Sequence, residues 1–599
     1  MSRVVMLALL ICFASPLVEG QKKPTTTSSL CTKDNALDTT KQQIVSTRTF
    51  DNPVQRITVL IRAADLLWPY DQEKSLAAFT EAFDLAVQNF KENGDQEKRT
   101  SKSQFAARIQ LPDQRFRVIG ALARRDPARA RKLSDRLLQE QAKEMAEKPA
   151  VDKKAEKLAG EKMLQLGRDL VQSDVPSAVN FARQAFRYPA TLNLTQFIYD
   201  LARVNRQAAD QFYVEALGVY GAKSMDQFLY LSSYPFGNSR DAGEMPGYTV
   251  YTVPEGFVPS QALQRQFMQI LLSRGEAATG TAVDPNSSYR YPDHAQMWFA
   301  LTRLEKQVQD NLPDLAETAA RTKEKLFAAL NQNTQEQIAG QITADNEPKK
   351  SFDEQVELAE KQKNPGRRDQ LLTFAVTGAS KPEPVEKVLG VIDKISEASV
   401  RDSLLNWFYY FRAQSLINSK ELREARKLAN KVTELDQRAY LFTRIAEESL
   451  KQTEDQSEAR DVLNEIADAV SKAPKTIVSA RASLALAHLY AKLDVNRGIE
   501  ELANAVKLIN ALESPDFSQL FVLMKIEGKT FGSFASISTP GFNPENAFGE
   551  IGKLDFDSSL VQATTFTDKS LRALTTLAVI EPCFSPQKAQ KPHKAQNKN

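Results

Sequence analysis

The feature that most constrains the fold of this sequence is a helical spacing that returns along the chain. Small or aliphatic residues, with one tyrosine, stand at positions i, i+4 and i+7 in several segments between Pro53 and Leu512. The sets are Ala78/Ala82/Leu85, Ala130/Ser134/Leu137, Ala178/Ala182/Ala185, Ala209/Tyr213/Ala216, Ala425/Ala429/Val432, Ala459/Leu463/Ile466 and Ile499/Ala503/Val506. These offsets place three residues on one stripe of a helix, where small side chains let a second helix approach closely. A single set is ordinary, but its recurrence predicts a helical repeat.

Similar polar turns precede these helices. In "RRDPARA", Asp126 can cap the following helix and Pro127 stands in its first turn, where a missing N–H costs nothing. Asp71, Asp174, Ser419 and Asp494 occupy comparable turns. The unit that repeats is therefore predicted to be a helix, a short turn and a second helix.

Paired helices with this second-helix stripe resemble the tetratricopeptide family of helical-repeat α-solenoids. The stripes begin roughly 31 to 52 residues apart, whereas a strict tetratricopeptide repeat has a period of about 34. The tryptophan-leucine-glycine-tyrosine signature of the first helix is absent, so the resemblance is to a divergent, tetratricopeptide-like α-solenoid. It implies a mainly α fold in which stacked helix pairs share a core and leave a concave surface for a protein or peptide partner.

The first residues indicate export. Arg3 precedes the apolar run Val4–Phe13, and small or modest residues precede a cleavage site before Gln21. This run is too short to cross a membrane, which takes roughly 20 residues. We expect a signal peptide and a periplasmic or extracellular protein without a membrane span.

The rest of the chain divides by composition. We expect a polar leader, N-terminal repeats, an irregular insertion rich in Gly, Pro and aromatic residues, C-terminal repeats, a small cap and a basic disordered tail. These segments are residues 21–52, 53–230, 231–294, 295–514, 515–584 and 585–599, after the signal peptide at 1–20. The cap is predicted to be α/β or β, because "QLFVLMKIE", "KTFGSFASIST" and "SSLVQATTFT" read as strands, whereas "LRALTTLAVI" fits a helix or a strand.

Charge and motifs exclude several functions. The 78 basic residues nearly balance the 75 acidic ones, which argues against a nucleic-acid-binding protein. The three histidines have no HExxH spacing and the cysteines no CxxC spacing, so no metal site is expected. "GKT" at 528–530 lacks the glycine that a phosphate loop needs at Leu523. We expect no cofactor and assign no catalytic residue.

The middle segment holds the candidate ligand-binding residues. Aromatic side chains gather there with arginines, carboxylates and one histidine. The candidates are Tyr234, Phe236, Arg240, Asp241, Tyr248, Tyr251, Tyr289, Arg290, Tyr291, His294 and Trp298. They can line a groove for a sugar or a peptide, or anchor long loops on the helices, and we favour anchoring.

The leading functional interpretation is a non-catalytic scaffold for protein–protein or protein–peptide interaction. The alternative is a carbohydrate-active enzyme on paired helices closed into a toroid, similar to α/α-barrel polysaccharide lyases. That resemblance implies proton abstraction by Tyr291, His294 and Arg290. Only three tryptophans are present to stack on sugars, which favours the scaffold.

Cys31 and Cys583 are the cysteines that remain after signal cleavage. Exported compartments oxidise thiols, and an intramolecular bond needs Cα atoms within about 7 Å. Three states stay open: a bond within the chain, free thiols and a bond between two chains.

Overall fold

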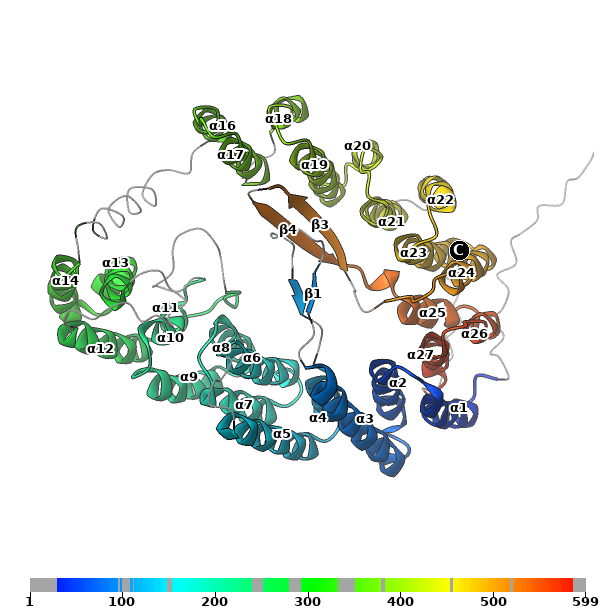
Figure 1. Ribbon diagram of the computed structural model, residues 1–599, viewed down its shortest axis with the longest axis horizontal. Helices are drawn as coiled ribbons and strands as arrows, with labels where there is room; N and C mark the ends of the chain where they lie inside the picture. The colour runs from blue at the N-terminus through cyan, green and yellow to red at the C-terminus, as the bar shows by residue number, and fades with distance from the viewer. Residues whose placement is uncertain are drawn as a thin grey trace, which may run out of the picture. The chain divides into compact units, whose positions relative to one another are not determined.

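The computed structural model confirms a mainly helical, repeat-like architecture with few strands (Figure 1). It describes residues 30–94, 97–99, 108–110, 113–147, 153–239, 251–278, 292–330, 332, 335, 351–378, 383–452, 456–517, 521–529 and 531–584. Among these residues, no helix is both long enough and apolar enough to cross a membrane.

The chain forms two compact units. The terminal unit comprises Met1–Thr39, Ser449–Leu520 and Thr539–Asn599, and the central unit comprises Thr40–Glu448 and Phe521–Ser538. Each unit therefore contains segments that are far apart in the sequence.

Most of the central unit is helical. Its elements, beginning with the end of α1, are α1(Lys33–Ser46), η1(Thr47–Thr49), α2(Pro53–Leu67), α3(Gln72–Asn93), β1(Glu97–Arg99), β2(Arg108–Gln110), α4(Gln114–Ala123), α5(Pro127–Glu147), α6(Lys153–Leu170), α7(Val175–Gln184), η2(Ala185–Arg187), α8(Leu192–Val204), α9(Arg206–Tyr220), α10(Met225–Leu229), η3(Tyr230–Ser232), α11(Ser233–Phe236), α12(Gln261–Ala277), α13(Asp293–Asn311), α14(Pro313–Ala328), α16(Phe352–Glu360), α17(Pro365–Gly378), α18(Val385–Ile392), α19(Ala398–Asn418), α20(Leu422–Ala429), α21(Leu435–Gln452), β3(Phe521–Glu527) and β4(Gly532–Ser538).

The terminal unit holds the first half of α1 and the last helices of the chain. These are α22(Ser457–Lys472), α23(Ile477–Leu493), α24(Val495–Asn510), η4(Pro540–Phe542), α25(Pro544–Gly552), α26(Phe556–Thr564), α27(Lys569–Ile580) and η5(Glu581–Phe584). Its core is made by α23, α24 and the helices that follow η4.

Consecutive helices pack as hairpins whose second helix is capped by the turn residue. α2 packs on α3, α6 on α7, and α23 on α24. The Asp71 carboxylate accepts the Lys74 N–H at 3.1 Å, and Asp174 accepts the Ser177 N–H at the same distance. Ser419 lies in a turn as well, but its hydroxyl donates back to the Ser415 carbonyl and caps nothing.

The predicted stripes face the core. Ala82, Ala130, Ala178 and Ala459 have no exposed surface, and most other stripe residues are buried as well. Leu85, Ile499 and Ala503 are half-buried exceptions. The stripes thus mark the seams at which helices meet, which is the packing that small residues permit.

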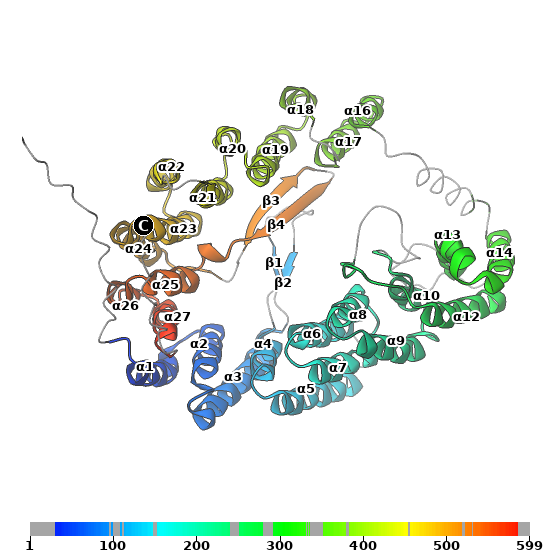
Figure 2. The same ribbon diagram turned by 180° about the vertical axis from the view of Figure 1, so that it is seen from behind.

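The described residues form two antiparallel strand pairs, β1–β2 and β3–β4 (Figures 1 and 2). In β3–β4, seven residue pairs run in register from Phe521↔Ser538 to Glu527↔Gly532. Val522 and Met524 are buried, and β3 packs against α19 within the central unit. The pair β1–β2 was not expected, because three-residue strands carry too little periodicity to be recognised.

Two expectations about local structure are corrected. The stretch "SSLVQATTFT" lies mostly in helix α26, as far as Thr564, rather than in a strand. Asp555 caps this helix through the Ser558 N–H, and Ser559 and Ala563 are buried four residues apart. The predicted irregular insertion 231–294 contains the 17-residue helix α12 and the start of α13. The stretch "LRALTTLAVI" is helical, in α27.

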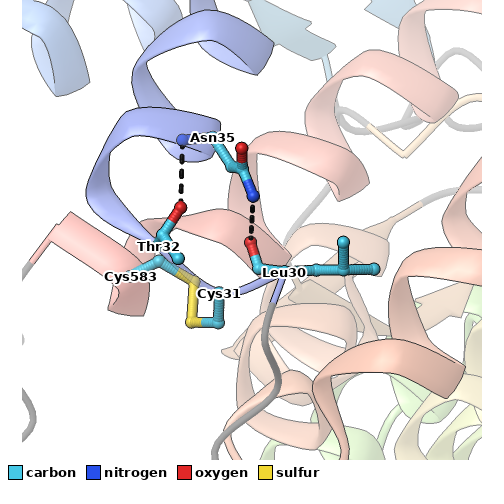
Figure 3. The surroundings of a disulfide bond; sticks show 5 residues. All are labelled: Leu30, Cys31, Thr32, Asn35 and Cys583. Carbon is cyan, nitrogen blue, oxygen red and sulfur yellow. Dashed lines mark hydrogen bonds between the residues drawn. A yellow bond between two sulfur atoms is a disulfide. The ribbon is translucent and has the colours of Figure 1, made fainter.

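Cys31 and Cys583 form a disulfide within the terminal unit, with their Cα atoms 5.2 Å apart. Figure 3 shows the bond beside the first turn of α1. There Asn35 donates its N–H to Thr32 Oγ1 at 3.2 Å and its amide to the Leu30 carbonyl at 3.1 Å. The cysteine thus stands directly before a hydrogen-bonded helix start.

Candidate functional site

The described candidate residues of the middle segment are all buried. Tyr234, Phe236, Tyr251, His294 and Trp298 are between 0% and 7% exposed. The other six candidates, Arg240, Asp241, Tyr248, Tyr289, Arg290 and Tyr291, lie outside the described residues. Buried rings cannot line an open groove, so the placement of these five residues favours anchoring.

Tyr199 of α8 is the centre of this aromatic core. Its ring centroid lies 5.4 Å from Tyr234, 6.1 Å from Tyr251 and 5.3 Å from Phe257. Its hydroxyl lies 3.0 Å from the carbonyl oxygens of Ser233 and Asn238. Aromatic pairs at these distances add stability beyond their buried area. They hold residues 251–257 against α8 and α11.

Arg206 and Asp210 connect this core to the surface of α9. Arg206 donates to Asp210 Oδ1 and to the Val258 carbonyl, both at 2.8 Å, and lies 4.3 Å from the Phe257 ring centroid. The Tyr234 hydroxyl donates to Asp210 Oδ1 at 2.7 Å. Burial, and then this carboxylate, raise the pKa of Tyr234 far above its ordinary value, so it stays a neutral donor.

A surface groove runs along α9 and α12 from this ion pair. Two adjoining hollows of about 740 Å³ and 450 Å³ form it and share Val214. We call this surface the α9–α12 groove. Its lining is Arg206, Gln207, Asp210, Gln211, Val214, Glu215, Leu217 and Gly218 of α9 with Leu263, Gln266, Gln269, Ile270, Ser273 and Arg274 of α12.

The centre of the groove is apolar and open. Val214, in the middle of α9, is 43% exposed. A Cβ added at Gly218 would meet no atom within 4 Å. A glycine inside a helix costs about 1 kcal/mol relative to alanine. Here that cost is not offset by closer packing within the described chain.

The charged side chains beside the groove have partners within the chain. Arg183 donates to both carboxylate oxygens of Glu215 at 2.7 Å, and this bonding lowers the pKa of Glu215. Arg274 donates to the Gly221 carbonyl at 3.0 Å and lies over the Phe228 ring. Paired charges at the rim and an apolar centre suit the binding of apolar side chains, since no strong net charge selects the ligand.

The described groove lining offers no nucleophile beside a base, and no cluster of metal-ligating residues occurs among the described residues. The groove residues were missed at the sequence level. Gly218 was the available signal, since an isolated glycine inside a helical pattern marks a packing or functional position.

Comparisons with known proteins assign no family to this chain. No family model matches it, and no curated protein matches it. Among solved structures, a chain titled "Homology model of the full-length AP-3 complex in an intermediate open conformation" is 11% identical. The match covers 88% of this chain and 78% of that one at a TM-score of 0.20, too low to carry an argument.

Proposed function

We propose that this protein is an exported, non-catalytic scaffold of tetratricopeptide-like helical repeats that binds an apolar segment of a partner protein in the α9–α12 groove. The observation that carries the proposal is the open apolar centre of the groove at Val214 and Gly218. Both hollows fall within the range of about 300–1,000 Å³ that is typical of binding sites.

Apolar side chains are the ligand chemistry that this groove fits. Exposed apolar surface gains roughly 25 cal/mol per Å² when a partner removes it from water. The ion pairs Arg206–Asp210 and Arg183–Glu215 stand at its polar rim. Such exposed pairs add little affinity but restrict how a partner can lie.

Export is supported by two independent features. Residues 1–20 have the pattern of a secretory signal peptide. Cys31 and Cys583 are bonded to each other, and structural disulfides persist mainly in oxidising compartments.

The position of His294 does not favour the lyase alternative. A general base must come within hydrogen-bond reach of the proton that it abstracts. His294 is 3% exposed at the start of α13.

The test compares three variants of the mature chain. Gly218→Trp fills the centre of the groove and Gly218→Ala leaves it open. Thr80→Trp adds the same bulk to a different hollow, of about 650 Å³, on α3. Each immobilised variant captures proteins from the envelope fraction of its own cells, and the captured protein is then purified for titration calorimetry.

We expect Gly218→Trp to weaken binding by at least about tenfold, an amount equal to 1.4 kcal/mol. Gly218→Ala and Thr80→Trp should stay within about twofold of the wild type, a difference of less than 0.5 kcal/mol. Equal binding by all three variants, with unchanged circular dichroism, would refute the groove as the binding site.

A further inference from the structure

The backbone of β4 has one edge that is not paired. The Gly528 N–H donates to the Phe531 carbonyl at 2.9 Å, which makes these two residues a hydrogen-bonded pair. Paired and unpaired positions alternate along an antiparallel ladder. The N–H and C=O groups of Gly532, Phe534, Ser536 and Ser538 therefore point away from β3. Within the described part of the chain, no hydrogen bond reaches them.

The opposite edge of the hairpin is covered. The same alternation turns the backbone of Leu523 away from β4, and its carbonyl accepts a hydrogen bond from Gln437 Nε2 at 3.1 Å. Asn406 of α19 donates to Gln437 Oε1 at 2.7 Å and holds the amide in place. A helical side chain thus satisfies an outward carbonyl of β3, whereas the outward groups of β4 accept and donate no such bond within the described residues.

β4 also lacks the features that usually protect an edge strand. Proteins place lysine, proline, bulges or inward-facing charges on such edges to prevent pairing. The stretch "GSFASIS" has no charged residue and no proline, and its register with β3 is continuous. Phe534 is 63% exposed on the outer face, opposite Lys525.

We propose that β4 is a strand-addition site that binds an extended, uncharged segment of another polypeptide. The segment pairs with the outward backbone groups of Gly532, Phe534, Ser536 and Ser538, and an apolar side chain of the segment covers Phe534. Backbone pairing supplies affinity and the alternate side chains supply selectivity. The site belongs to the β3–β4 hairpin and does not depend on the α9–α12 groove.

The size of the edge selects a peptide segment over a second copy of this chain. Seven residues of strand are about 24 Å long, and an added strand lies only about 4.8 Å from its neighbour, so the contact is a narrow strip. A stable complex of two folded proteins buries about 800 Å² on each partner. A flexible segment needs less area because backbone hydrogen bonds provide much of its affinity.

The test uses a random dodecapeptide phage library selected on the full mature chain. Selected peptides are synthesised with and without N-methyl groups on alternate residues, and their affinities are measured for the wild type and three variants. Ser536→Pro removes an outward N–H that β3 does not use, and Phe534→Lys adds an edge charge. Ser536→Thr is the matched control.

We expect selected peptides to lose at least about tenfold in affinity for Ser536→Pro and Phe534→Lys, since a ladder hydrogen bond or an apolar contact is removed. Ser536→Thr should stay within about twofold, because it keeps the backbone N–H. N-methylation of the paired residues should abolish binding. In hydrogen exchange, the amides of Phe534 and Ser536 should become protected by the peptide.

The amides of Ala535 and Ile537, which pair with Met524 and Val522, report whether each variant keeps its hairpin. A library that yields no binder, or binders that do not distinguish the variants with intact hairpins, would overturn the proposal. Dimerisation of the free chain in sedimentation velocity that Ser536→Pro abolishes would also overturn it, by assigning the edge to a second copy.

Discussion

Asp369 joins two helices of the central unit through one buried carboxylate. The residue lies on α17 and is 2% exposed. Its oxygens accept the Ser396 hydroxyl at 2.7 Å and the Glu397 N–H at 2.9 Å, directly before α19 begins. A carboxylate at a helix start satisfies free N–H groups and the helix dipole together.

We therefore predict that Asp369→Ala lowers the free energy of unfolding by about 2–3 kcal/mol, because buried donors lose a charged acceptor. Asp84→Ala is the control, since Asp84 is 59% exposed on α3 and lies 3.7 Å from Arg136. That change should cost less than about 0.5 kcal/mol. Urea titrations followed by circular dichroism measure both, and equal losses would contradict the assigned role.

His488 provides a prediction about pH. Burial on α23, and then the charge of Lys492, lower its pKa from 6.5 to about 4, while Glu550 opposes the shift and Lys553 adds to it. Between pH 4 and pH 6.5, His488 is therefore mostly protonated in the unfolded chain and mostly neutral in the folded chain. The stabilising effect is complete above pH 6.5 and is lost as the pH falls toward 4.

Because His488 is half-buried, we expect this loss to be about 2 kcal/mol rather than the full value of the shift. In His488→Gln the loss should vanish. The measurement is the difference in unfolding free energy between wild type and variant at pH 7, 5.5 and 4. The carboxylates titrate in both proteins, so their effect on stability cancels in this difference. A difference that does not change with pH would exclude this assignment.

At the scale of elements, two helical glycines have opposite roles. A Cβ at Gly498 of α24 would lie 2.5 Å from the Ala491 Cβ of α23, so glycine permits the close contact of these helices. At Gly218 of α9 the same atom would meet nothing within 4 Å. The intrinsic helix preference for alanine is the same at both sites, and only the packing differs.

We predict that Gly498→Ala destabilises the chain by about 1–2 kcal/mol net, since overpacking exceeds the gain in helix propensity. Gly218→Ala should stabilise it by about 0.5–1 kcal/mol. Each variant is the control for the other in denaturant unfolding. If both variants changed the unfolding free energy in the same direction, helix propensity alone would account for the effect and the packing difference would be refuted.

How far the sequence predicts these elements depends on how local the signal is. The stripes of Ala178 and Ala459 predicted buried helix faces correctly because i, i+4 spacing is a local property. The strand prediction for "SSLVQATTFT" was wrong. Its Thr, Val and Phe residues favour strands, but Asp555 and the neighbouring helices stabilise a helix. For the site, the buried placement of Tyr234 fitted the anchoring interpretation, but the α9–α12 groove depends on which helices become neighbours.

At the scale of the molecule, the compact units do not follow chain order. The terminal unit combines Met1–Thr39 with two later segments, and Phe521–Ser538 belongs to the central unit. Composition along the chain defines consecutive segments, so it cannot predict units of this kind. The disulfide lies within the terminal unit, where it joins the first of these segments to the last.

The disulfide between Cys31 and Cys583 should stabilise the folded chain. Cys31 and Cys583 are separated by 552 residues, and a cross-link over so long a loop removes much of the freedom of the unfolded chain. The chain-entropy estimate is about 6 kcal/mol, while native disulfides typically contribute about 2–5 kcal/mol.

Peptide mapping without reduction should recover the two cysteines in one cross-linked species. Cys31→Ala, Cys583→Ala and the double variant should lose the same stability, because each removes the same bond, so the single effects do not add. Two separately alkylated thiols in the isolated protein, or additive losses in the variants, would contradict the bond.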